Sequence, residues 1–225
     1  METQFAKLKT YATFARHFGG KFMRERAQEM KTDVAPAPRV PPAPQLWDNE
    51  KLTVAWLGHA TLLINFYGTW LVTDPALRSR VGVSIAGLLT LGPRRLVQPA
   101  LAIRELPRLD AVLLSHAHMD HTDMGTLGRL PRRTRMVVQR GNRDLVRRFR
   151  QVDELSWGES TEVGGVRVES LEVNHWARAP LPTATAATAD SCWKSAAARS
   201  SSEETRLIRN LSRLCADARR ASTWP

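Results

Sequence analysis

Short apolar runs punctuated by glycines predict β-strands through the middle of the chain. They are Leu52–Leu57, Thr61–Phe66, Trp70–Thr73, Ala111–Leu114, Arg135–Val138 and Val166–Val173. The segment Asn142–Gln151 predicts a short helix between strands. Because strands come first and helices follow, we expect an α+β fold with helices outside the sheets. The chain has no GxGxxG motif and no P-loop, which argues against a nucleotide-binding fold.

The two ends of the chain differ from this middle part. Residues 1–34 predict an N-terminal helix, because apolar side chains recur there at steps of three or four residues. A membrane-surface anchor would have the same pattern, but Gly19-Gly20 interrupts it and favours a helix packed on its own domain. Residues 35–46 are a proline-rich linker. We expect a domain over 47–176 and a disordered or irregular tail over 177–225.

Composition limits the classes of protein. No apolar stretch approaches the roughly 20 residues that span a membrane, and the N-terminal segment has no signal-peptide core. We therefore expect a cytoplasmic protein with no transmembrane segment, and leave peripheral membrane contact and oligomeric state open. The net charge of +11 would suit a nucleic-acid partner. However, the arginines are scattered and no basic run carries interleaved aromatics, so no nucleic acid is expected.

The segment Ser115–His121, SHAHMDH, carries the candidate chemistry. It follows a buried strand, and on an extended backbone His116 and His118 point to the same side. Imidazoles and a carboxylate suit zinc and similar divalent ions. Since the whole chain has only six histidines, three of them in one loop are not expected by chance. Four such groups exceed what one open zinc takes from so short a segment, so a pair of adjacent ions is predicted.

The HxHxDH pattern after an apolar strand resembles the signature of the metallo-β-lactamase superfamily. Further motifs match in the same order: WLGHAT over 56–61, LVTDP over 71–75, GPRR over 92–95 and NHW over 174–176. Together they resemble the branch of N-acyl-phosphatidylethanolamine phospholipase D, ascorbate-6-phosphate lactonase and the RomA-like hydrolases. The resemblance implies an αββα sandwich, of which this chain holds the N-terminal half.

The resemblance also implies a ligand set. His116, His118 and His175 would hold the first metal, and Asp120 and His121 the second. Two divalent ions are expected in the family, zinc first, with manganese or iron as alternatives because His and Asp ligands serve all three. This chain would hold two ions or only one.

The resemblance implies roles other than metal binding for three residues, one of which, Asp120, is also a ligand. Asp120 would act as the catalytic residue that orients the attacking water and passes its proton on. Asp74 would steady the metal-binding loop, and His59 would contact the substrate or support the ligands. A histidine after a strand is also often merely structural.

The resemblance implies a hydrolase that cleaves an ester, lactone or phosphodiester bond with a metal-activated water. The substrate would be a small molecule or derived from a lipid. A non-catalytic metal-binding remnant is the first alternative. A nucleic-acid-processing hydrolase, suggested by the net charge, is the second and less favoured one, because the WLGHAT and NHW motifs are typical of the lipid and lactone branch.

The C-terminal part departs from the family. Relatives have a GGDT-type aspartate that bridges the metals and a final histidine, and neither occurs here. A reading frame one base earlier can encode YGGFLLE from Thr188–Lys194 and ILFGGDTAY from Ser200–Ile208, with a suitable choice of synonymous bases. We therefore expect a frameshift between the codons of about His175 and Leu181, and impaired activity in this copy.

The nucleotide sequence across the codons for residues 170 to 210 tests this expectation. Read one base earlier, it should give both family-like strings without a stop codon. Synonymous bases that cannot encode them would show instead that the printed tail is in frame.

Overall fold

The computed structural model describes residues 33–37, 40–81, 83–85, 89–91, 94–172 and 191–197. Three expected features lie mainly outside these ranges. They are the N-terminal helix, of which only residues 33 and 34 are described, His175, and the C-terminal tail except residues 191–197.

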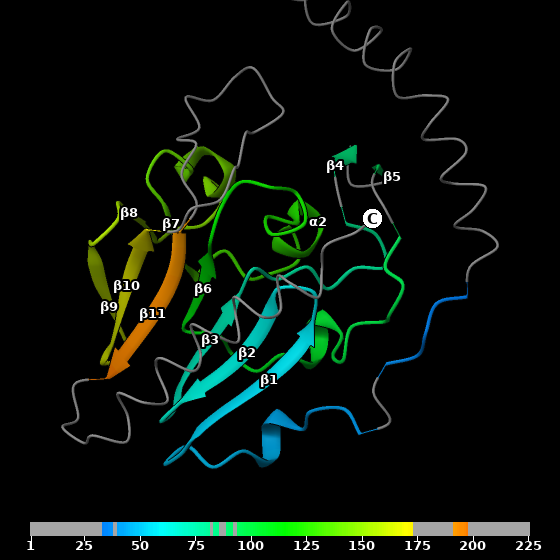
Figure 1. Ribbon diagram of the computed structural model, residues 1–225, viewed down its shortest axis with the longest axis horizontal. Helices are drawn as coiled ribbons and strands as arrows, with labels where there is room; N and C mark the ends of the chain where they lie inside the picture. The colour runs from blue at the N-terminus through cyan, green and yellow to red at the C-terminus, as the bar shows by residue number, and fades with distance from the viewer. Residues whose placement is uncertain are drawn as a thin grey trace, which may run out of the picture.

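The strand pattern forms one large mixed sheet, in the order β1-β2-β3-β6-β7-β8 (Figure 1). β1, β2 and β3 are antiparallel neighbours, whereas β3, β6, β7 and β8 run parallel. Five of the six predicted strands lie in this sheet, each within about one residue of its expected bounds. The bounds are β1 Leu52–Gly58, β2 Thr61–Phe66, β3 Thr69–Thr73, β6 Ala111–Leu114, β7 Arg135–Gln139 and β8 Val152–Leu155.

A second, antiparallel sheet has the order β11-β10-β9, built from β9 (Ser160–Val163), β10 (Val166–Glu172) and β11 (Ser191–Ala197). β11 falls in the tail that was expected to be irregular. It pairs with β10 from Val166↔Ala197 to Glu172↔Ser191, which satisfies backbone groups that an edge strand would leave open. A small hairpin of β4 (Val83–Ile85) and β5 (Leu89–Leu91) lies apart from both sheets.

The main sheet is covered on both faces, which explains why its parallel strands read as continuous apolar runs. On one face Leu113 and Val137 pack against Val166 and Val168 of the second sheet. The other face, which includes Val112, packs against helical segments and their flanking loops. Its buried residues are Val72, Val112, Leu114, Leu127, Leu130, Met136, Val138, Val146 and Phe149. The described residues thus form helix, sheet and sheet layers, an incomplete αββα sandwich.

The helical elements are short. α2 covers Met124–Leu127, and the 3-10 turns η1, η2 and η3 cover Pro44–Leu46, Ile103–Glu105 and Arg143–Val146. The helix expected over Asn142–Gln151 was therefore too long. The backbone of Gln151 already accepts a hydrogen bond from Met136 N, at 2.9 Å, where the pairing of β7 with β8 begins, so little chain remains for a helix.

Candidate metal centre

Parallel pairing of β3 with β6 brings two sequence motifs to the same end of the sheet. The register Thr73↔Leu113 continues into a hydrogen bond of 3.0 Å from Asp74 N to Leu113 O. The residue after β3 therefore lies beside Ser115, the first residue after β6. α2 lies beyond the carboxyl ends of these strands (Figure 1).

Asp74 joins the two strand ends through its carboxylate. Oδ1 accepts from Ser115 N at 2.7 Å, and Oδ2 accepts from Ser115 Oγ at 2.6 Å and from His121 Nδ1 at 2.8 Å. Burial opposes ionisation of Asp74, but the charge and hydrogen bond of His121 and the bonds from Ser115 hold its pKa below the ordinary value. The buried group is therefore a carboxylate, with donors on both oxygens.

These contacts decide which imidazole nitrogens are basic. Because a carboxylate only accepts, His121 Nδ1 carries a proton, and Nε2 is the nitrogen that has the lone pair once the ring is neutral. Ser115 Oγ uses its hydrogen for Asp74, so it accepts from His116 Nδ1 at 2.9 Å and leaves His116 Nε2 basic. Burial, with the charge of His121, lowers the pKa of His116 to about 3. His116 is therefore neutral at pH 7, the form that binds metals.

Donor atoms gather here in two neighbouring groups. His116 Nε2 lies 3.0 Å from His118 Nδ1. Asp120 Oδ2 lies 3.1 Å from His59 Nε2 and 3.6 Å from His121 Nε2, and one ligand atom from each of these three residues lies within 4.8 Å of the others. The ring centroids of His116 and His121 are 4.1 Å apart, which makes the two groups adjacent.

The donor set fits divalent ions. Ligands at about 2.0–2.2 Å from a tetrahedral zinc lie about 3.3–3.6 Å from one another, close to the separations within each group. Burial opposes ionisation of Asp120, but the hydrogen bond of His59 and the charge of His121 keep its pKa well below the ordinary value. Its side chain is 46% exposed, so the charged carboxylate is also open to solvent.

His59 reaches this group from the turn between β1 and β2. Gly58 and His59 both have left-handed backbones, with φ of 105° and 54°. The indole of Trp56 holds the turn by donating to His59 O at 2.7 Å. The turn thus directs a side chain from the far edge of the β1–β2–β3 meander towards Asp120.

Buried threonines hold the loops of the centre together, and no role was predicted for them from sequence. Thr61 Oγ1 donates to Asp74 O at 2.8 Å, and Thr73 Oγ1 donates to Ala60 O at 3.0 Å. Thr122 Oγ1 donates to His116 O at 2.7 Å. All three residues are buried. Thr61 and Thr73 lie at the ends of apolar runs, and this polar ending within a strand pattern is the signal that could have identified them, whereas Thr122 follows the histidine loop and had no such signal.

Asp123 is the residue that caps the start of α2. Its side chain accepts from Gly125 N and Thr126 N at 3.1 Å and from Thr126 Oγ1 at 2.6 Å. The residue is completely buried. This cap fixes where the loop after β6 ends, two residues beyond His121.

The structure brings together all of the predicted site residues that it describes. These are His59, Asp74, His116, His118, Asp120 and His121. His175, expected as a third ligand of the first metal, lies outside the described residues.

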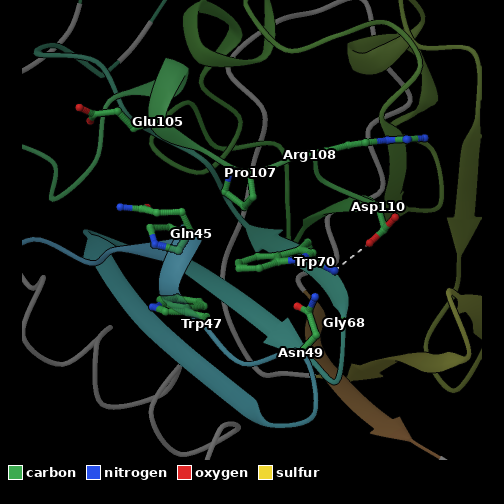
Figure 2. A pocket seen from close by; sticks show the side chains of 10 residues that line it. Gln45, Trp47, Asn49, Gly68, Trp70, Glu105, Pro107, Arg108 and Asp110 are labelled. Carbon is green, nitrogen blue, oxygen red and sulfur yellow. Dashed lines mark hydrogen bonds between the residues drawn. The ribbon is translucent and has the colours of Figure 1, made fainter.

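A groove of about 600 Å³ lies at the other end of β3 (Figure 2). Its walls include Trp47 and Trp70, whose rings stack with centroids 5.4 Å apart. Asp110 Oδ2 accepts from Trp70 N at 2.8 Å there. Among the described residues this groove holds no group of three metal-ligating side chains, so the candidate centre is the carboxyl end of the sheet.

The chain matches the family model described as a β-lactamase superfamily domain, over residues 69–193. This is more than half of the chain, and it includes both strands that carry the centre. The chain therefore belongs to the β-lactamase superfamily, in its metallo-β-lactamase form.

Two relatives illustrate the similarity. An uncharacterized protein of Mycobacterium tuberculosis is 32% identical over 148 residues, which cover 63% of this chain and 39% of that protein. The N-acyl-phosphatidylethanolamine-hydrolyzing phospholipase D 1 of Caenorhabditis elegans is 32% identical over 121 residues, or 49% of this chain and 33% of that protein. The chain thus matches well under half the length of these relatives.

Solved structures with a similar fold include CmlA, a diiron β-hydroxylase from Streptomyces venezuelae. It is 22% identical, with a TM-score of 0.48, over 65% of this chain and 28% of that one. An isothiocyanate hydrolase from Delia radicum gut bacteria is 20% identical, with a TM-score of 0.46, over 55% and 49%.

Among the described residues, no helix has the length and apolar character needed to cross a membrane.

Replacing Asp74 by Asn tests the junction of β3 and β6. The amide nitrogen would face a donor of Ser115 or His121, so a buried polar group loses its partner. We expect urea denaturation of the metal-free chain to give a free energy of unfolding lower by about 1–3 kcal/mol. The exposed Asp144→Asn is the matched control and should change it by less than about 0.5 kcal/mol. Equal stability of the two variants would contradict the assigned contacts.

Proposed function

We propose that this chain carries the metal centre of a metal-dependent hydrolase, acting on an ester, lactone or phosphodiester bond. The observation that carries the proposal is the pair of adjacent donor groups at the carboxyl ends of β3 and β6. Membership of the β-lactamase superfamily supports it. The name of the Caenorhabditis elegans relative supports a lipid-derived substrate as the first to test.

The first ion would be held by His116 and His118, with His175 as the third ligand that we expect from the sequence. The second would be held by Asp120 and His121. Bound divalent ions supply a Lewis acid for the attacked bond and lower the pKa of a water molecule towards neutrality. Asp74 holds the Nδ1 side of His121, so that Nε2 is the nitrogen that would bind the ion.

Asp120 is the residue we assign to proton transfer. Its low pKa keeps the carboxylate ionised, and its partial exposure gives water access to it. It orients the attacking water and accepts a proton as the new bond to oxygen forms. His59 holds this carboxylate through the 3.1 Å contact with Oδ2. Asp120 then passes this proton on to the leaving group as the bond between that group and the attacked atom breaks.

We further propose that this chain, with its C-terminal part as it stands, binds one ion firmly and the second weakly. The second donor group has only Asp120 and His121 as proposed ligands, and the bridging aspartate would arise only in the shifted reading frame. A single-ion site gives low turnover because the pair of ions no longer shares the developing charge. A domain over residues 47–176, a cytoplasmic location and the absence of a nucleic-acid partner stay predictions.

Metal analysis of the purified chain tests the proposal. After zinc loading and gel filtration we expect about one firmly bound ion. Activity is measured on an N-acyl-phosphatidylethanolamine and on chromogenic phosphodiester, ester and lactone substrates. A chelator should remove the ion and abolish the hydrolysis. The double variant His116→Ala/His118→Ala should retain no firmly bound zinc, because both proposed donors of the first group are gone. His17→Ala, the one histidine outside the proposed site, is the control.

Three results separate the alternatives. Full zinc retention by the double variant would refute the centre. Firm zinc binding without hydrolysis of any of the three bond types would favour a metal-binding remnant. Two firmly bound ions with rapid turnover would refute the impaired activity.

A further inference from the structure

The segment around Arg95 lies between two loops of the metal centre. Arg95 N donates to Ser79 O at 2.9 Å, in the loop that follows β3. Five residues later, Ala100 N donates to Leu57 O at 3.2 Å, near the end of β1. The backbone at and after Arg95 is thus fixed to the loop that follows β3 and to the end of β1.

The Arg95 side chain makes the same connection more directly. Its Nη1 donates to Ala76 O, two residues after Asp74, and its Nε donates to Val97 O at 3.3 Å. Its Nη2 lies against Gly58, where a Cβ would collide with the guanidinium. Gly58 directly precedes His59. One half-buried guanidinium therefore spans from the loop behind Asp74 to the turn that carries His59.

The charge of Arg95 also interacts with a carboxylate near the centre. Burial lowers the pKa of Arg95, and the nearby carboxylate of Asp123 opposes the shift. Asp123 is buried at the start of α2, two residues after His121. The guanidinium thus contacts two of the three segments of the centre and interacts electrostatically with the third.

We propose that Arg95 is a positioning residue of the metal centre, whose guanidinium fixes the β1–β2 turn so that His59 stays against Asp120. Trp56 and Thr73 hold the turn through the carbonyl groups of His59 and Ala60, and the guanidinium restrains it at Gly58. A planar guanidinium can donate to Ala76 and Val97 while its Nη2 points at Gly58. A lysine ammonium cannot reproduce this geometry. The consequence for metal affinity rests on the proposed function, whereas the position of His59 does not.

The experiment compares Arg95→Met and Arg95→Lys with Arg108→Met. Arg108 is exposed on the wall of the groove at the other end of the sheet (Figure 2), which makes it the matched control. In the metal-free chain, NMR correlations of the histidine rings should shift or broaden for His59 in both Arg95 variants and stay unchanged in Arg108→Met. If Arg95→Met does not fold, Arg95→Lys, which keeps the charge, carries the comparison.

Zinc titration supplies the second readout. We expect both Arg95 variants to weaken the weaker zinc-binding step by about tenfold, as for residues that orient metal ligands. In a His59→Ala background, Arg95→Met should have no further effect, because it acts through His59.

Unchanged His59 resonances in a folded Arg95 variant would overturn the proposal. The proposal would also be overturned if Arg95→Met weakened zinc binding by the same factor in the presence and in the absence of the His59 side chain. If zinc titration shows no second binding step, the proposal of a second ion is refuted. The His59 resonances then decide the role of Arg95 by themselves.

Discussion

The metal centre depends on one buried carboxylate between two parallel strands. Burying a charged group is costly unless it is fully hydrogen-bonded, and Asp74 meets this condition with Ser115 and His121. Those partners can reach it only if β3 and β6 pair in the observed register. The same bonds fix the orientation of His121 and, through Ser115, that of His116. Fold and ligand geometry are therefore set by the same contacts.

Much of this arrangement was predictable from the sequence. The apolar runs identified the strands because both faces of the main sheet are buried, and HxHxDH identified the loop because histidine is rare in this chain. β8 and β9 were not predicted. Their sequences, VDEL and STEV, have few apolar residues, and their strand conformation follows from pairing with β7 and β10. β11 likewise depends on the open edge of β10.

The contacts between motifs could not be predicted from local pattern. WLGHAT, LVTDP and GPRR were recognised as markers, but nothing in their spacing relates Gly58 to Arg95 or Thr61 to Asp74. These contacts join residues far apart in sequence, and they require the turn after β1, the loop after β3 and the segment before η2 to meet at one end of the sheet. The sequence therefore left His59 between a structural and a functional role, and the structure places its Nε2 3.1 Å from Asp120 Oδ2.

The location of bound zinc tests the account most directly. Anomalous diffraction at the zinc edge from crystals of the loaded chain should give a peak within about 2.0–2.1 Å of one ring nitrogen each of His116 and His118, with His175 completing the same coordination sphere. A peak elsewhere on the chain, or His175 beyond any shared sphere with the other two imidazoles, would contradict the assignment of this centre.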